Sequence, residues 1–505
     1  MSRTVSTAFA EPWKPRDYQK KALKFLLEHA CAGLLLKPGL GKSSTTLAAI
    51  SFLKKRKMIN RVLIIAPLRP CYVVWPREIA RWADFNHLTI SIAHGPNKEA
   101  ALTSGSDIVV INPEGLDWLL GVEKEVVYRT VKDPRTGKVH EAPKKKITVD
   151  VKRFKKYGFD VLCIDELSKF KHHGTGRFAA LKHVLDTFGR RWGLTGSPSS
   201  NGLLDLFGQC YVLDLGNALG PYITHYRDRY FNADQYKRTF KLKPGAEAQI
   251  YEAIEPLMLS MGYENLDMPE LIMNNIWVQL PDDIRETYDL MEDAFIAAVE
   301  ERIVTAKNAA AKSSKLRQIV NGGVFLDPKI LPSGLQQPKS AREWVNLHSE
   351  KISALRDLTD ELQGDPLLVA YDFEHDLDRL RKAFKDGVFA CDYSMKQFPA
   401  LEAKWNRGEI PILFGHPQSL GHGLNLQDCA QNIAWHSMTW NRELYDQFID
   451  RVWRQGNKFK QVFVHHIMAE DTIDEVIFGA LNYKGSVEDA LFTGIRELAA
   501  KRRAR

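Results

Sequence analysis

The sequence predicts an α/β protein with two tandem lobes, each built on a parallel β-sheet. Its 505 residues exceed the ~250–300 residues at which a single hydrophobic core stops growing, so two cores are expected. Short apolar runs alternate with helical segments in the first 215 residues, and this alternation returns after residue 349. We therefore expect an N-terminal lobe at 1–215, a helical bridge at 216–348 and a C-terminal lobe at 349–505.

In the first region each apolar run is short and stops at proline, glycine or an acidic residue. A helical segment, "YQKKALKFLLEHA", precedes the first run, "AGLLLK". The runs that follow are "RVLIIAPL", "SDIVVINP", "FDVLCIDEL" and "RRWGLTGSP". Nearly continuous apolar runs are typical of parallel strands buried on both faces, and functional groups gather at the C-terminal ends of such strands.

The second region repeats this pattern after a bridge. Residues 283–320 have helical spacing of apolar side chains, and the glycine- and proline-rich stretch 321–338 indicates an extended connection. Apolar runs then return as "PLLVAYD", "GVFACD", "IPILFGHP", "NIAWHS" and "QVFVHHI". These runs predict a second parallel sheet.

The composition is that of an ordinary globular protein, with 44% hydrophobic and 26% charged residues. The chain has no apolar run of about 18 residues, so we expect no membrane span, and its first residues lack the apolar core of a secretory signal. The six cysteines are scattered without a C-x-x-C pair, which favours buried thiols over disulfides or a zinc site. An intracellular enzyme or a large binding protein fits these features.

The stretch "LLLKPGLGKSSTTLAAI", Leu34 to Ile50, is similar to a phosphate-binding loop. The full pattern G-x-x-x-x-G-K-[ST] would place its first glycine at position 36, which is Leu36. The stretch nevertheless follows an apolar run and opens a helical one, as such a loop requires. Gly39 and Gly41 would let backbone N–H groups approach phosphate oxygens. A plain glycine turn before a helix is the alternative.

Three side chains at the start of that helix are the candidate ligands. Lys42 would reach the β- and γ-phosphates, and Ser43 would hold Mg²⁺. Ser44 belongs to the same cofactor-binding segment.

Two acidic residues, Asp165 and Glu166, end the run "VLCID". At this position Asp165 would bind Mg²⁺ together with Ser43, and Glu166 would orient and deprotonate the attacking water. An acidic pair after a strand is also a common helix N-cap, so by itself it leaves both interpretations open. The phosphate-binding loop upstream favours the catalytic one.

The chain resembles superfamily-2 helicase ATPases, specifically the Swi/Snf-type branch of double-stranded DNA translocases. That branch has the loop G-L-G-K-T after a strand and does not need the earlier glycine, so Leu36 is no defect. The similar segments follow one another along nearly the whole chain: "PRDYQKKAL" (15–23), "LIIAPLRPCYVVWPREIARW" (63–82), "DELSKFK" (165–171), "LTGSPSSNGLLDLFGQCYVLD" (194–214), "SKLRQIVNGG" (314–323), "SEKISALRDLTDEL" (349–362), "SLGHGLNLQDCAQNIAWHSMTWN" (419–441) and "QFIDRVWRQGN" (447–457).

The resemblance implies two RecA-like lobes and several residue roles. Gln19 would recognise adenine. Arg451 and Arg454 belong to the family's arginine motif, and we expect both on one face of a helix, three residues apart. They would stabilise charge on the transferred phosphoryl group from the second lobe, so that the catalytic site assembles only on closure.

Two departures from the family pattern affect coupling and DNA contacts. Ser168 stands where the family has histidine, which bears on how hydrolysis is coupled to the second lobe. His416 and Pro417 stand where the family prefers small hydroxyl residues that contact the DNA backbone.

Positive charge is concentrated in one insertion, 124–156. The whole chain has a net charge of +8, and this insertion, with twelve basic and four acidic residues, has a net charge of +8 by itself. Strand-like "EVVYRTV" and "KKKITVDV" flank the turn "DPRTGK", which predicts a basic β-hairpin. It either clamps a nucleic-acid backbone through phosphate contacts or is a passive solvated hairpin. A second basic cluster, "KRRAR", ends at Arg505 and fits a solvated tail.

The predicted function is an ATP-dependent translocase on double-stranded DNA, forked or branched DNA included, with ATP and Mg²⁺ as cofactors. Two alternatives stay open: a strand-separating DNA or RNA helicase, and an ATP-regulated nucleic-acid clamp with little turnover. We expect a monomer that does not bind membranes. A cytoplasmic location is expected for a prokaryotic or viral protein, and a nuclear one for a eukaryotic protein.

Overall fold

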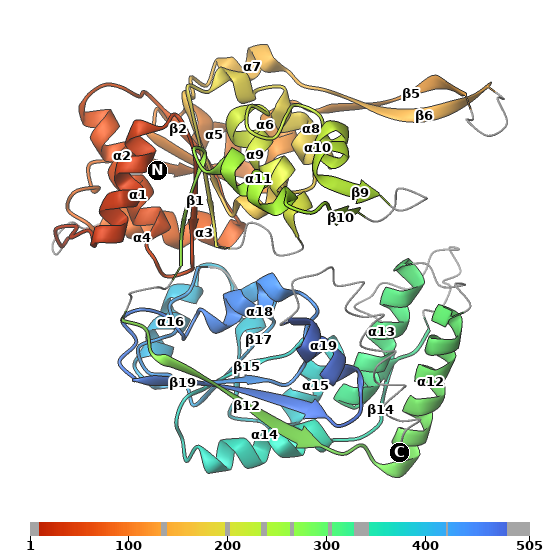
Figure 1. The fold of residues 1–505 in the computed structure, drawn as a ribbon. Helices are drawn as coiled ribbons and strands as arrows, with labels where there is room; N and C mark the ends of the chain where they lie inside the picture. Colours follow the sequence, from red (N-terminus) through yellow and green to blue (C-terminus); the bar gives the residue numbers. More distant parts are fainter. Residues whose placement is uncertain are drawn as a thin grey trace. The chain divides into compact units, whose positions relative to one another are not determined.

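The computed structural model describes residues 10–132, 139–196, 202–233, 240–262, 267–300, 306–327, 343–420 and 423–481. The chain forms two compact units, Met1–Glu264 and Asn265–Arg505, called here the N-terminal and C-terminal units (Figure 1). Parts of the sequence patterns lie outside the described residues: the turn 133–138, positions 197–201 and 421–422, and the basic cluster 501–505.

The N-terminal unit is built on a seven-stranded sheet in the order β11-β1-β8-β7-β2-β4-β3. All of its neighbouring strands are parallel. The strands are β1 (Cys31–Leu36), β2 (Val62–Ile65), β3 (Ile90–Ile92), β4 (Ile108–Ile111), β7 (Val161–Asp165), β8 (Arg190–Thr195) and β11 (Met258–Met261). The apolar runs predicted as parallel strands are therefore confirmed.

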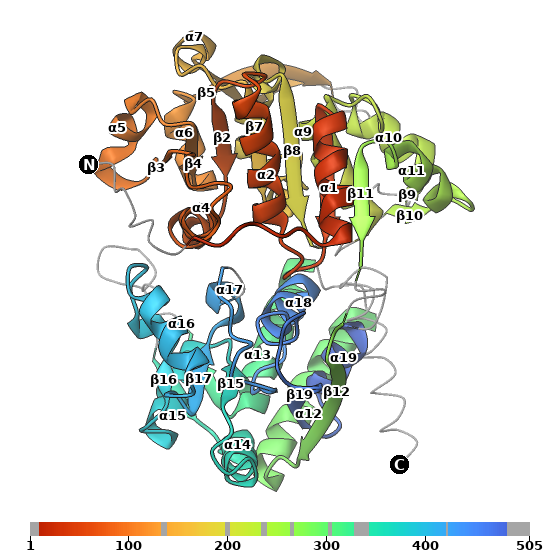
Figure 2. The ribbon, with the colours of Figure 1, turned by 90° about the vertical axis from the view of Figure 1, so that its left-hand side faces the viewer.

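Helices cover both faces of this sheet (Figure 2). One face carries α1 (Asp17–Glu28), α2 (Lys42–Lys55) and α4 (Val74–Arg81). A short helix, α3 (Leu68–Tyr72), directly precedes α4 in the chain. The other packs in one apolar cluster with α5 (Lys98–Thr103), α6 (Leu116–Leu119), α8 (Gly176–Lys182), α9 (Leu206–Asp214), α10 (Ile223–Tyr230) and α11 (Ala246–Ile254). This three-layer arrangement buries the sheet and leaves its strand ends for function.

A long antiparallel hairpin projects from the N-terminal unit (Figure 1). It consists of β5 (Glu123–Lys132) and β6 (Val139–Thr148), paired from Glu123 with Thr148 to Lys132 with Val139. A short helix, α7 (Val151–Lys155), follows it. A second, smaller hairpin pairs β9 (Phe231–Ala233) with β10 (Phe240–Leu242). The predicted basic β-hairpin is confirmed.

The C-terminal unit has a six-stranded parallel sheet in the order β12-β19-β18-β15-β17-β16. Its strands are β12 (Glu270–Val278), β15 (Leu367–Ala370), β16 (Val388–Phe389), β17 (Ile412–Gly415), β18 (Asn432–Trp435) and β19 (Gln461–Ala469). Two tandem parallel-sheet lobes of the RecA-like kind are thus confirmed.

Two apolar clusters fill the C-terminal unit, one on each face of the sheet. One involves α14 (Glu350–Glu361) and α15 (Glu374–Ala383). The other involves α12 (Asp282–Glu300), α13 (Ala306–Asn321), α16 (Phe398–Asn406), α18 (Arg442–Ile449) and α19 (Ile473–Leu481). A short helix, α17 (Pro417–Leu420), and a small hairpin, β13 (Gly323–Phe325) with β14 (Trp344–Asn346), complete it.

The unit boundary differs from the three segments expected from sequence. The expected bridge, 216–348, supplies β11 to the N-terminal sheet, and β12, α12 and α13 to the C-terminal unit. Strand β11 pairs with β1, and strand β12 pairs with β19, which lies far away in sequence. Such long-range pairing gives no local signal. In the described part of the chain, no helix is both long and apolar enough to cross a membrane.

Candidate active site

The loop between β1 and α2 has the backbone geometry of a phosphate-binding loop. Leu36 is the last residue of β1 and its side chain is fully buried, so the loop begins after the position where the longer pattern has glycine. Gly39 and Gly41 have φ angles of 84° and 73°, in the region that favours glycine. A Cβ atom at Gly41 would lie 2.2 Å from Nε2 of Gln19. The close approach of these two residues therefore requires glycine.

The predicted ligand side chains surround this loop. Lys42 Nζ donates to the Leu36 carbonyl at 2.7 Å, which folds the lysine back over the loop. Gln19 Nε2 lies 3.5 Å from the Leu40 carbonyl, and Gln19 Oε1 accepts from the Arg16 N–H at 2.9 Å. Ser43 is half-buried in the first turn of α2.

Ser44 differs from these residues in what it contacts. Its hydroxyl donates to the Gly41 carbonyl at 3.0 Å, and the residue is buried. Ser44 therefore shapes the loop through a local hydrogen bond.

Strand register brings the loop and the acidic pair to one edge of the sheet. Strand β8 lies between β1 and β7, with Leu35 opposite Thr195 and Asp165 opposite Leu194. The three strands are parallel, so their C-terminal ends meet at the same edge. The sequence separates these segments by more than a hundred residues, and the sheet places them two strands apart, on either side of β8.

Asp165 accepts a hydrogen bond from Trp75, a residue of the family-like segment 63–82 that had no predicted role. The indole Nε1 of Trp75, a fully buried residue of α4, donates to Asp165 Oδ2 at 3.1 Å. Burial and the neighbouring charge of Glu166 raise the pKa of Asp165 to about 6, against the opposing effects of Lys42 and the Trp75 N–H. Two adjacent carboxylates in such a setting favour a bound cation.

Glu166 has a strained backbone and an anchored side chain. Its φ of 67° lies in the left-handed region, which costs a non-glycine residue about 1–3 kcal/mol and persists where the surroundings enforce it. Oε1 of Glu166 accepts hydrogen bonds from the Ser168 hydroxyl at 3.0 Å and the Thr195 hydroxyl at 3.3 Å. Ser168, the residue that replaces the family's histidine, thus contacts the predicted base directly.

The two arginines of the C-terminal unit do not share a helix face, contrary to the prediction. Helix α18 ends at Ile449, and Arg451 and Arg454 lie in the turns that follow it. The Arg451 carbonyl accepts from the Leu426 N–H at 3.0 Å, which draws this backbone group to a distant segment and away from a helical ladder.

Both arginines contact the segment 424–426 of the C-terminal unit. The buried Arg451 guanidinium donates to the carbonyls of Gln447, at 2.9 Å, and Leu424, at 3.1 Å. The partly buried Arg454 donates to the side-chain oxygen of Asn425. The arginine motif and the "GLNL" segment therefore form one structural element.

The other departure, His416, has a defined contact. His416 Nε2 lies 3.1 Å from Asp372 Oδ1, and Arg317 also contacts the Asp372 carboxylate. Desolvation raises the pKa of Asp372, but hydrogen bonds and charge from His416 and Arg317 outweigh it and hold that pKa below its usual value.

Three residues of the site were missed as participants: Trp75, Ser168 and Thr195. Each lies within a segment that carried the family resemblance, so sequence marked their positions. The contacts of Trp75 and Thr195 join segments far apart in the sequence, and the contact of Ser168 with Glu166 depends on the local turn, so none of the three is visible in the sequence pattern.

A family model and several relatives match this chain. A model of the SNF2-related domain matches residues 18–326. Protein p41 of Acyrthosiphon pisum secondary endosymbiont phage 1 is 32% identical over 501 residues, which cover 95% of this chain and 98% of p41.

More distant relatives are longer. The ISWI chromatin-remodeling complex ATPase ISW2 of Saccharomyces cerevisiae is 23% identical over 493 residues, which cover 94% of this chain but 40% of ISW2. Among solved structures, the Sulfolobus solfataricus SWI2/SNF2 ATPase core in complex with dsDNA is 20% identical, with a TM-score of 0.41, and the match covers 95% of this chain and 93% of that one.

Proposed function

The chain belongs to the SNF2-related family of ATPases, and on this premise we propose that it is an ATP-driven translocase on double-stranded DNA. As a family member it is an ATP hydrolase. The observation that carries the proposal is the meeting of the phosphate loop, Thr195 and the Asp165–Glu166 pair at the ends of three adjacent parallel strands.

Nucleotide binding in this proposal uses the loop after β1. The backbone N–H groups from Gly39 to Ser43 surround the phosphates, and Lys42 exchanges its bond to the Leu36 carbonyl for the β- and γ-phosphates. Gln19 recognises the adenine. The hydroxyl of Ser43 and the carboxylate of Asp165 hold Mg²⁺, which neutralises phosphate charge.

Hydrolysis in this proposal depends on Glu166 as the general base. Ser168 and Thr195 hold one carboxylate oxygen of Glu166, and its second oxygen accepts the proton of the attacking water. The Ser168 hydroxyl thereby positions the base Glu166 through a hydrogen bond, in the place where the family has histidine. Arg451 and Arg454 of the C-terminal unit complete the site when the units close around ATP.

Double-stranded DNA is proposed as the track. The solved structure named above is a complex with dsDNA, and the hairpin β5–β6 of this chain has the charge for backbone contacts.

The test is the ATPase rate with no nucleic acid, single-stranded DNA, duplex DNA, forked DNA and duplex RNA. We expect the largest stimulation with duplex DNA, together with ATP-dependent displacement of a third strand from a DNA triplex. Stimulation mainly by single strands would instead indicate a strand-separating helicase. Tight DNA binding with no stimulation would indicate a clamp.

Two variants test the residue roles in the same assay. Glu166→Gln retains ATP binding but loses ~10²-fold or more in turnover, because no group accepts the proton of the water. Lys42→Ala weakens nucleotide binding and turnover together, because a phosphate ligand is lost. Wild-type turnover in either variant contradicts its assigned role.

A further inference from the structure

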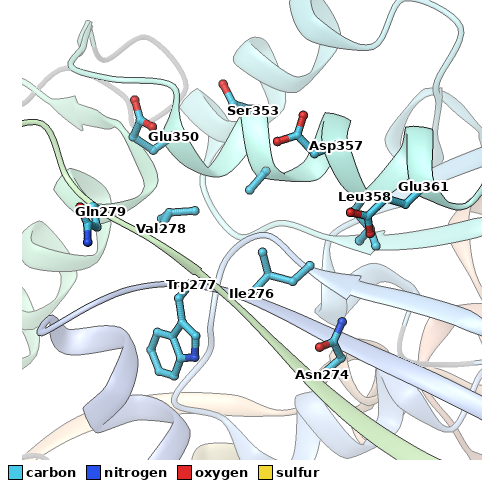
Figure 3. A pocket seen from close by; sticks show the side chains of 11 residues that line it. Asn274, Ile276, Trp277, Val278, Gln279, Glu350, Ser353, Asp357, Leu358 and Glu361 are labelled. Carbon is cyan, nitrogen blue, oxygen red and sulfur yellow. The ribbon is translucent and has the colours of Figure 1, made fainter.

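A groove of about 430 Å³ lies in the C-terminal unit between strand β12 and helix α14. It includes none of the residues assigned to ATP or DNA above. Figure 3 shows Glu350, Asp357 and Glu361 on α14 and the strand β12 beside this helix, and all three carboxylate residues line the groove. The residues that matter here are Asn274, Ile276 and Trp277 of β12, and Glu350, Asp357 and Glu361 of α14.

The floor of the groove includes an open sheet edge. In the part of the chain that the structure describes, β12 is the terminal strand of its sheet and pairs with β19 alone. Proteins usually protect such edges with lysine, proline or a bulge, because an edge strand is a template for another strand. The nine residues of β12, "ELIMNNIWV", contain neither lysine nor proline, and Met273 and Trp277 are 47% and 45% exposed.

The rim of the groove is acidic. Glu350, Asp357 and Glu361 are spaced by seven and four residues, which places them on one face of α14. The residues that line the groove include no basic side chain, and none of these three carboxylates has an ion-pair partner among the described residues. This charge repels nucleic acid. It also disfavours pairing of β12 with β12 of a second copy, because two acidic stripes would then meet.

We propose that this groove binds an extended, basic segment of a partner protein, which adds a strand to β12. Main-chain hydrogen bonds to the free edge supply affinity, and Lys or Arg side chains at alternate positions meet the three carboxylates. The spacing is compatible for one pair of carboxylates. Alternate residues of a strand lie about 6.7 Å apart, and Asp357 and Glu361 are about 6 Å apart along the helix axis. This inference does not depend on the proposed translocase activity.

The test uses the full chain and a labelled nine-residue peptide of alternating lysine and valine, titrated by fluorescence anisotropy. The triple variant Glu350→Gln, Asp357→Asn, Glu361→Gln should bind it about tenfold more weakly, because three surface charge pairs are lost. A peptide with proline at every valine position has the same charge but cannot form the strand hydrogen bonds. It should bind the wild-type protein at least as weakly as the lysine–valine peptide binds the triple variant.

A matched control removes three exposed carboxylates outside the groove: Asp360→Asn, Asp386→Asn and Glu255→Gln. This variant should bind the lysine–valine peptide as the wild type does, and both triple variants should retain the wild-type ATPase rate. Equal binding by the groove variant, or equal binding of the proline peptide, would overturn the proposal. So would no binding of the lysine–valine peptide to the full chain.

Discussion

Asp165 couples the stability of the N-terminal unit to the chemistry proposed for it. Its pKa is raised from 3.8 to about 6, first by burial and then by the charge of Glu166. A carboxyl group with a raised folded-state pKa binds its proton more tightly when folded. The stability that it contributes is therefore complete below pH 3.8 and is lost as the pH rises through about 6. At neutral pH the free protein has a penalty that a bound cation would relieve.

We predict that Asp165→Asn raises the free energy of unfolding at pH 7 by about 3 kcal/mol, because asparagine cannot ionise. The gain should shrink to roughly half at pH 5, where the wild-type carboxyl is mostly protonated in the folded state. Urea unfolding of the nucleotide-free protein at both pH values measures it. Asp186→Asn, at an exposed position, is the control and should leave stability unchanged. A gain of equal size at both pH values would show that charge is not the cause.

At the scale of elements, the buried strands were predictable, but the edge strands β11 and β12 were not. The runs that became β2 and β4 are apolar throughout, and those of β7 and β8 are apolar except at their charged or polar ends, because both faces of the sheet are covered. This composition is visible locally. Strand β11 has four residues, and every position of the edge strand β12 is exposed or half-buried, without a regular alternation. Their partners, β1 and β19, lie about two hundred residues away in the chain, so no short pattern predicts the pairing.

The phosphate loop and the acidic pair were predictable for the same reason, since each follows a buried strand directly. The end of helix α18 at Ile449, before Arg451 and Arg454, was not predictable. This end depends on the bond from the Leu426 N–H to the Arg451 carbonyl, a contact across twenty-five residues. Local spacing cannot distinguish a helix that continues from one ended by such a contact.

The hairpin β5–β6 is the element whose proposed role is easiest to isolate. We predict that replacing Lys144, Lys145 and Lys146 with Gln weakens duplex DNA binding without changing the basal ATPase rate. Each lost phosphate contact lowers the slope of log affinity against log salt by about 0.9, so three contacts lower it by roughly 2–3 units. The loss should be similar for all DNA sequences, because backbone contacts carry no base information.

A matched control variant loses the same three positive charges next to the hairpin and not within its strands. Lys152, Lys155 and Lys156, which are exposed residues at α7, are replaced with Gln in a second variant. Salt titrations of duplex binding then compare the two variants. If the slope stays at the wild-type value for the hairpin variant, or falls equally for both, the hairpin makes no specific phosphate contacts and only contributes to the general potential.

At the scale of the whole molecule, the proposal assigns the two arginines to a site that needs both units. Arg451 and Arg454 make different contacts within the C-terminal unit, so they have different structural roles there. Arg451 is 7% exposed and its guanidinium satisfies two backbone carbonyls, so it supports the turn as well as any bound phosphate. Arg454 is more accessible and contacts the Asn425 side chain. Removing each arginine should therefore have a different consequence.

We predict that Arg454→Ala abolishes DNA-stimulated ATP hydrolysis while the free energy of unfolding changes by less than about 1 kcal/mol. Arg451→Ala should lose the same stimulation and also destabilise the C-terminal unit by about 3 kcal/mol, because two buried carbonyls lose charged donors. Stimulated ATPase rates, urea unfolding and ATP affinity without DNA are measured for both variants. ATP affinity should change little in Arg454→Ala, since the proposed mechanism uses this arginine only when the units close. Normal stimulated turnover in Arg454→Ala would remove it from the catalytic site, and equal destabilisation by both substitutions would make each a structural residue of the turn.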